Sequence, residues 1–224
     1  MSMREKVTVT CPGCGKKGPF TIWPSLNTVL DPAMKAKVLD GSLFTYECPQ
    51  CGRKTEVEYG LLYHQMNDKI MIQVDETMQS FEKSGIQEMM DMMSGDGYLI
   101  RLVPDTNTLR EKIHIFDDGL DDRLMEILKA VTVLKLAKAS PEHISAPGGC
   151  RMYYLGDGGQ KKLLIYAEGL PEACIDITEP YEELCNTEFA KHLPSMRKSG
   201  PVVDLAWGAE ATKKTKALKK LGLL

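Results

Sequence analysis

One five-residue phrase occurs twice near the start of the chain, as CPGCG at residues 11–15 and as CPQCG at residues 48–52. Two cysteines separated by two residues lie on one tight turn, from which both thiolates point at the same metal ion. The proline fixes one φ angle at the start of each turn, and the glycine lets the chain leave the metal with a positive φ. The pattern therefore predicts a zinc ribbon in which Cys11, Cys14, Cys48 and Cys51 hold one Zn²⁺.

The spacing between the two pairs leaves room for other interpretations. The 33 residues between Cys14 and Cys48 exceed the roughly 15–20 of a compact four-cysteine site, and a short helix over 32–39 accounts for the excess. A redox dithiol and two unrelated turns with free thiols stay open as alternatives. Redox CxxC pairs normally sit at the start of a helix, whereas both pairs here follow predicted strands. Four cysteines fill the coordination shell, so the zinc is expected to be structural.

The composition excludes several classes of protein. The net charge of −3 and the pI of about 5.9 give no global positive field that would attract nucleic acid or an anionic membrane. No apolar run reaches the roughly 18 residues of a membrane helix, and the first ten residues lack the apolar core of a signal peptide. We therefore expect a cytoplasmic protein with no membrane partner, in which the seven cysteines do not form a disulfide framework.

Hydrophobic periodicity and turn residues predict an α+β fold, with an N-terminal zinc-ribbon-like β module that includes helices and a small α+β C-terminal module. Strands are predicted at 7–11, 20–23, 43–47, 55–59, 70–74, 98–103, 151–155, 162–167, 174–177 and 201–205. Helices are predicted at 32–39, 75–93, 107–116, 121–137 and 179–192. The expected domains are 1–139 (ribbon core 5–60, helical part 75–138), a linker at 140–149, the second module at 150–208 and a Lys-rich tail at 209–224.

Several longer phrases resemble the CpXC protein family over roughly residues 5–137. They are the two CPxC motifs, LDPAMKAKVLDGSL at 30–43, LLYHQMNDKIMI at 61–72 and LREKIHIFDDGLDDRLMEILK at 109–129. The resemblance implies that the four cysteines are metal ligands, and it implies no activity. Residues after about 140 lie outside it.

Two classes of function are compatible with these features. The first is a binding or scaffolding module whose partner is a protein, with nucleic acid kept open by a basic patch of Arg4, Lys6, Lys16 and Lys17. The second is an enzyme with a site between the ribbon and the C-terminal module. Its candidate residues are His64, His114, His143 and the acidic residues at 117–122.

Each candidate also has a plainer interpretation. Asp121 and Asp122 stand where acidic residues cap a helix, and His64 is expected at a polar surface or at the edge of the core. A zinc-linked dithiol redox sensor is a further alternative for the cysteines. The sequence leaves open the oligomeric state and the role of the Lys-rich tail.

Overall fold

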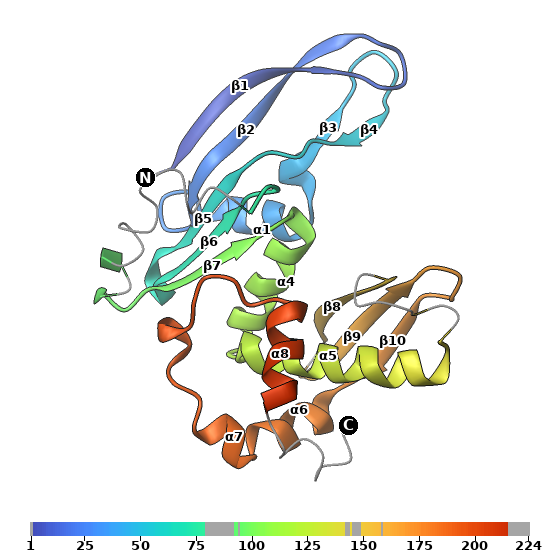
Figure 1. Ribbon diagram of the computed structural model, residues 1–224. Coiled ribbons are helices and arrows are strands. Elements are labelled where there is room, and N and C mark those ends of the chain that lie inside the picture. The colour runs from blue at the N-terminus through green and yellow to red at the C-terminus, as the bar shows by residue number, and fades with distance from the viewer. Residues whose placement is uncertain are drawn as a thin grey trace. The chain divides into compact units, whose positions relative to one another are not determined.

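The computed structural model describes residues 2–78, 92–93, 95–141, 144, 149–157 and 159–214 (Figure 1). It contains both helices and sheets, so the predicted α+β class is confirmed. Contacts within the chain divide it into two compact units, Met1–Arg110 and Glu111–Leu224, and helix α4 (Thr106–Asp117) contributes residues to both. The module boundary predicted at 140–149 stays a prediction.

The described strands of the first unit form one main sheet in the order β1-β2-β5-β6-β7, and β3 and β4 form a separate hairpin. Its elements are β1 (Met3–Thr10), β2 (Lys17–Asn27), α1 (Ala33–Leu39), η1 (Ser42–Phe44), β3 (Thr45–Glu47), β4 (Lys54–Glu56), β5 (Leu61–Gln65), η2 (Met66–Asp68), β6 (Ile70–Val74) and β7 (Leu99–Val103).

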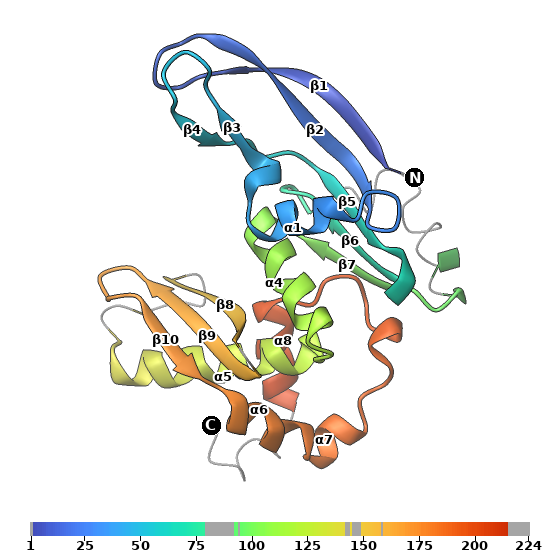
Figure 2. The same cartoon turned by 180° about the vertical axis from the view of Figure 1, so that it is seen from behind.

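Two hairpins of this unit position the cysteines. β1 and β2 pair antiparallel from Met3 to the turn at 11–16, whereas only the last residues of β2, from Ser25 to Asn27, pair with β5. The distal half of the β1-β2 hairpin therefore extends past the strand that follows it in the sheet. The β3-β4 hairpin lies beside this distal half (Figures 1 and 2).

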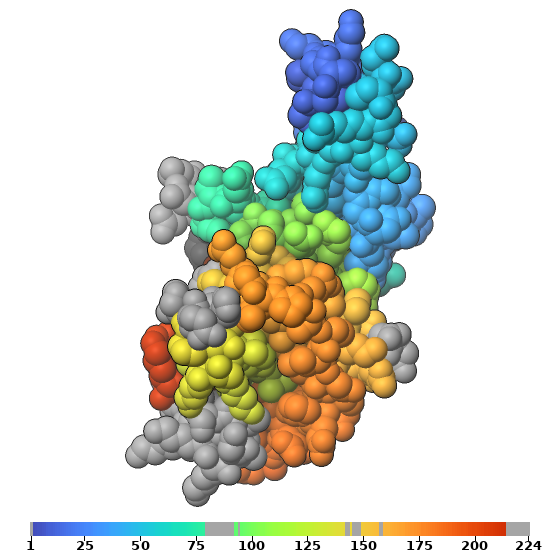
Figure 3. Space-filling view, turned by 90° about the vertical axis from the view of Figure 1, so that its right-hand side faces the viewer, coloured from blue at the N-terminus to red at the C-terminus, as the bar shows by residue number. Residues whose placement is uncertain are grey.

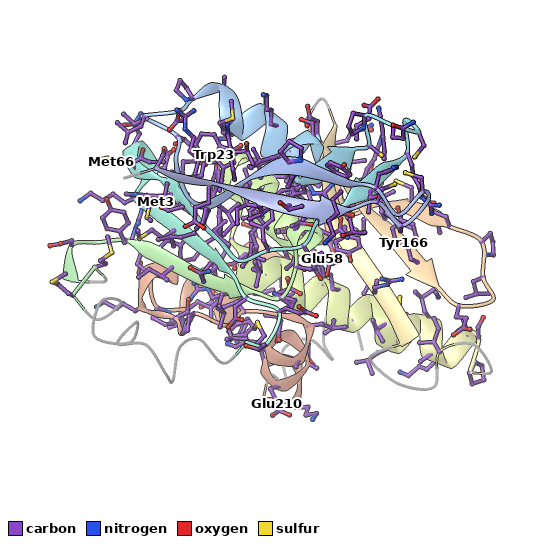
Figure 4. All side chains as sticks on the ribbon, turned by 90° about the horizontal axis from the view of Figure 1, so that it is seen from above. Met3, Trp23, Glu58, Met66, Tyr166 and Glu210 are labelled. Atoms are coloured by element: carbon purple, nitrogen blue, oxygen red, sulfur yellow. The ribbon has the colours of Figure 1, made fainter. Side chains whose placement is uncertain are left out.

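The opposite end of the main sheet is anchored by an apolar core. Leu26, Tyr63 and Ile72 are fully buried on neighbouring strands, because alternate residues of β2, β5 and β6 point to the same face. Met3 and Met66 lie at this end, away from the cysteine-bearing turns (Figure 4).

The second unit pairs a small antiparallel sheet, in the order β10-β9-β8, with helices that share its core (Figure 2). Its elements after α4 are α5 (Asp122–Ala139), β8 (Cys150–Asp157), β9 (Gln160–Ala167), β10 (Ala173–Asp176), α6 (Thr178–Cys185), α7 (Glu188–Lys191), η4 (Met196–Lys198) and α8 (Leu205–Lys214). Strands β8 and β9, which follow each other in the chain, pair antiparallel from Cys150 with Ala167 to Asp157 with Gln160.

A network of buried charges joins α4 to α5 in this unit. Lys112 Nζ donates to Asp122 Oδ2 at 3.0 Å and to Glu126 Oε1 at 3.1 Å, and Lys129 Nζ donates to the same Glu126 oxygen and to Glu111. All five side chains are at most 5% exposed. Such a network requires full pairing, because an uncompensated buried charge is strongly destabilising.

Several local predictions were wrong, for identifiable reasons. The strand predicted over 201–205 is absent, because residues 201–204 are coil and Leu205 begins α8. The Val203 carbonyl accepts a hydrogen bond from Lys112 instead of a strand partner. The helix predicted over 179–192 is two helices, interrupted where the side chain of Thr187 caps α7. The helix predicted over 75–93 falls mostly outside the described residues.

Most other predicted strands and helices of the first unit lie close to the observed ones. The strand predicted over 55–59 overlaps β4 only at residues 55–56, and the strand predicted over 43–47 begins within η1. The strand predicted over 70–74 coincides with β6, and the helix predicted over 32–39 is α1. Strand β5 carries alternating buried residues but was not predicted. Among the described residues, no helix combines the length and apolar character needed to span a membrane.

Candidate metal centre

The two cysteine turns have the same backbone geometry. In the first, Gly15 N donates to Cys11 O at 2.9 Å and Cys11 N donates to Lys16 O at 2.9 Å. In the second, Gly52 N and Cys48 N make the equivalent bonds, also at 2.9 Å. The two glycines have φ angles of 71° and 70°, a left-handed conformation that glycine adopts without steric cost. The repeated phrase thus encodes a repeated turn.

The two turns bring four sulfur atoms into one cluster. Cys11 Sγ lies 3.6 Å from Cys51 Sγ, and Cys14 Sγ lies 3.7 Å from Cys48 Sγ. All four sulfurs lie within 4.8 Å of one another. Among the described residues, this is the one group of three or more Cys, His, Asp or Glu ligand atoms gathered so closely.

The sulfur separations fit a tetrahedral metal ion. A zinc ion with Zn–S bonds of about 2.3 Å places its sulfurs about 3.8 Å apart, close to the two cross-hairpin distances. The same distances are far longer than the roughly 2.05 Å of a disulfide bond. Cys11 and Cys48 are buried and Cys14 and Cys51 are exposed, so each hairpin contributes one inner and one outer sulfur.

The electrostatics of the cluster favour a bound cation. Backbone N–H groups, that of Cys51 foremost, lower the pKa of Cys48 to about 6, and the N–H groups of Cys14 and Gly13 lower that of Cys11. The Arg53 backbone also acts to lower the pKa of Cys51, but the neighbouring sulfurs of Cys11 and Cys14 outweigh it and raise that pKa to about 12. The turns stabilise the thiolates of Cys48 and Cys11. Their negative charge opposes ionisation of Cys51 unless a bound cation compensates it.

An aromatic side chain closes the inner side of the cluster. Tyr46 is 3% exposed and packs with Cys11 and Cys48 in a small core of its own. Its ring meets Phe20 edge-on, with centroids 6.1 Å apart and an interplanar angle of 87°. Burial first, and then the charge of Cys48, raise the pKa of Tyr46. A Cβ at Gly18 would overlap the Tyr46 hydroxyl, so the close approach of the two hairpins requires glycine there.

The other predicted site residues do not join this cluster. His64 is half-buried on β5, where its Nε2 lies 3.2 Å from the Tyr98 hydroxyl, and burial lowers its pKa. Asp121 caps α5 by accepting from Arg123 N, as predicted, whereas Asp122 is fully buried against Lys112. The four residues of the basic patch, Arg4, Lys6, Lys16 and Lys17, are all exposed.

The candidate enzyme residues are distributed over separate elements. His64 belongs to the first unit, and His114 lies in the second on α4. His143 lies outside the described residues. No three acidic residues of 117–122 converge within the described chain as the cysteine sulfurs do.

Sequence reasoning missed Tyr46, Gly18 and the buried charges of the second unit. Tyr46 stands two residues before Cys48, so strand alternation places both side chains on one face and was an available signal. Asp122, Glu126 and Lys129 recur at helical spacing on α5, which indicates one charged stripe. Nothing in the sequence marks that stripe as buried.

Comparison with known families agrees with the geometry of the four cysteines. The family model described as CpXC protein matches residues 9–129, which include both cysteine turns. No curated protein and no solved structure matches the chain. Because the match spans more than half of its length, the chain belongs to the CpXC protein family.

Proposed function

We propose that Cys11, Cys14, Cys48 and Cys51 bind one structural Zn²⁺. The observation that carries this proposal is the pair of cross-hairpin sulfur separations, 3.6 and 3.7 Å, which match the edges of a zinc–sulfur tetrahedron. Four thiolates leave no coordination position open for a substrate, so the role of the ion is structural.

The ion would join two hairpins that share little apolar contact. The local core at this place consists of Cys11, Tyr46 and Cys48, with a few partly buried neighbours. A core of that size supplies little hydrophobic stabilisation, and small modules of this kind depend on a staple. Metal binding would therefore set the relative position of the two turns.

The two turns present an exposed surface, which we call the ribbon tip and define as residues 12–17 and 49–54. Figure 3 shows these ends of the two hairpins, in blue and cyan, side by side. Every residue of the tip is exposed, and it contains four basic residues and no acidic one. The basic residues are Lys16, Lys17, Arg53 and Lys54.

We infer that the chain is a binding or scaffolding module whose metal-held tip contacts an acidic protein surface. Complementary charge supports this partner, since opposite potentials steer association and exclude like-charged surfaces. Nucleic acid is the competing polyanion, and its binding would weaken steeply with salt. A cytoplasmic location stays a prediction.

Native mass spectrometry of the purified chain tests the metal site. We expect one zinc per wild-type chain and none in Cys48→Ser. The matched control is Cys174→Ser, since that cysteine is exposed on β10 and far along the chain from the cluster. A wild-type chain purified without metal, and unable to bind added Zn²⁺, would contradict the proposal.

A charge-reversal pair tests the tip. Lys16→Glu with Arg53→Glu should abolish recovery of a crosslinked partner, whereas Lys213→Glu, at an exposed lysine of the second unit, should retain it. If the chain binds a DNA or RNA oligonucleotide with an affinity that falls steeply between 50 and 200 mM salt, the partner is nucleic acid and not a protein. Equal recovery by the two variants would exclude the tip as the contact surface.

The exposure of Cys14 and Cys51 favours a second candidate, a redox-sensitive zinc site. If the metal leaves, peroxide would oxidise two thiols to a disulfide while it is itself reduced to two molecules of water. Zinc release by equimolar peroxide, reversed by a thiol reductant, would support this role. Retention of zinc under those conditions would exclude it.

A further inference from the structure

Two buried hydroxyls in the described chain have no hydrogen-bond partner, those of Tyr46 and Thr55. The two residues face each other across the β3-β4 hairpin, beside the four cysteines. A buried hydroxyl without a partner is unfavourable by about 1–3 kcal/mol. Such a group in a folded protein calls for an explanation, and a bound ion that changes its surroundings is one of the established ones.

The surroundings of Tyr46 limit what that partner is. The side chain is 3% exposed, so bulk water does not reach it. Phe20 packs edge-on against the ring, and the hydroxyl lies directly over the backbone of Gly18. The tyrosine thus crosses from its own hairpin to the other one, within the small core that also contains Cys11 and Cys48.

The polar atoms available at that place are sulfurs. Cys11 and Cys48 are both buried in the same small core as Tyr46, and Cys48 stands two residues after Tyr46 along the chain. A neutral thiol is a weak hydrogen-bond acceptor. A metal-bound thiolate carries negative charge and accepts a stronger, charge-assisted hydrogen bond.

We propose that the Tyr46 hydroxyl donates a hydrogen bond to the Cys48 thiolate when the four cysteines hold a metal ion. This inference rests on the proposed metal site. The tyrosine acts as a positioning residue: it withdraws charge from one ligand sulfur and couples metal binding to the packing between the two hairpins. Outer partners of this kind typically change metal affinity 10- to 100-fold.

Tyr46→Phe tests the proposal, because it removes the hydroxyl and keeps the ring. The probes are Zn²⁺ and Co²⁺, titrated in competition with a chelator of known affinity. We expect Zn²⁺ affinity to fall about 10-fold or more. We also expect the sulfur-to-cobalt charge-transfer band to move to lower energy, since a thiolate without its hydrogen bond gives up an electron more easily.

The metal-free protein provides a second readout of opposite sign. In the absence of metal, Tyr46→Phe removes an unsatisfied hydroxyl, so the variant should be at least as stable as the wild type. A role in packing alone would change neither the affinity nor the band energy. Unchanged affinity with an unmoved cobalt band overturns the proposal.

Thr55→Val is the matched control, because it removes the other unpartnered hydroxyl from the same cross-strand pair. It should leave both the affinity and the cobalt band unchanged. An equal loss in Thr55→Val would overturn the assignment to Tyr46. Gly18→Ala retains the Tyr46 hydroxyl but displaces it, because the added Cβ would overlap it. This variant should therefore lower Zn²⁺ affinity as Tyr46→Phe does. Failure of the wild-type chain to bind either metal would instead refute the metal site itself.

Discussion

Lys112 offers the sharpest test of how the second unit is held together. Its ammonium group donates to Asp122, to Glu126 and, at 2.7 Å, to the carbonyl of Val203, and its side chain is 1% exposed. The full network sets three carboxyl groups against two ammonium groups. Lys112→Met leaves three carboxyl groups with one ammonium group, and it removes the partner that Asp122 and Glu126 share.

The expected loss is large on the scale of a small fold. Removing one partner of a buried ion pair is destabilising by about 3–5 kcal/mol, because the remaining charges stay buried with fewer partners. A domain of this size is typically stable by about 5–15 kcal/mol. Lys112→Met should therefore remove a fifth or more of the stability of the second unit, and a solvent-exposed ion pair would give a far smaller effect.

The chain offers a clean optical assay. It contains two tryptophans, Trp23 in the first unit and Trp207 in the second, where Trp207 packs against the core. In a Trp23→Phe background, tryptophan fluorescence during urea unfolding at pH 7 reports the second unit. The midpoint should fall with little change of the m-value, as expected for a loss of stability alone.

Lys213→Met is the matched control for the same substitution. Lys213 pairs with Glu210 at 2.7 Å, but its side chain is 71% exposed. Exposed helical pairs contribute about 0.3–0.5 kcal/mol, so this variant should be nearly neutral. If Lys112→Met costs less than about 1 kcal/mol, or no more than the control, the network is not a coupled buried unit and the reasoning fails.

Three further perturbations follow from single contacts. Gly52→Ala forces a side chain onto a φ of 70° and should weaken Zn²⁺ binding in chelator competition, and an unchanged affinity would contradict the strained turn. Burial raises the pKa of Glu111, so its contribution to stability is present below the usual pKa near 4.5 and is lost as pH rises through the folded value. Between pH 4 and 8, the urea midpoint of Glu111→Gln should fall less with rising pH than that of the wild type. Midpoints that fall in parallel in the two proteins would contradict this prediction. Tyr154→Phe removes a 2.6 Å bond to the Asp118 carboxylate and should cost about 1.5–3 kcal/mol in urea unfolding, whereas Tyr166→Phe, on an exposed ring, should cost almost nothing. Equal losses in the two variants would contradict the importance of burial.

The cluster of four cysteines could be predicted because the conformation of its two turns is specified locally. Each turn is specified within five residues by Cys, Pro and Gly, and the structure gives both turns the same hydrogen bonds. Strands and helices with clear periodicity, such as β6 and α5, were also predictable, since the pattern of apolar residues repeats within the element itself.

The tertiary structure decided what no local pattern contains. Tyr46 and Gly18 lie on different hairpins. Only the packing of those hairpins shows that the Tyr46 hydroxyl occupies the space where any side chain at position 18 would lie. Asp122 follows the local rule for a helix start, yet packing against Lys112 gives it a buried partner ten residues away. Short-range rules specify turns and periodic elements, whereas burial and long-range pairing depend on contacts that form only when the chain folds.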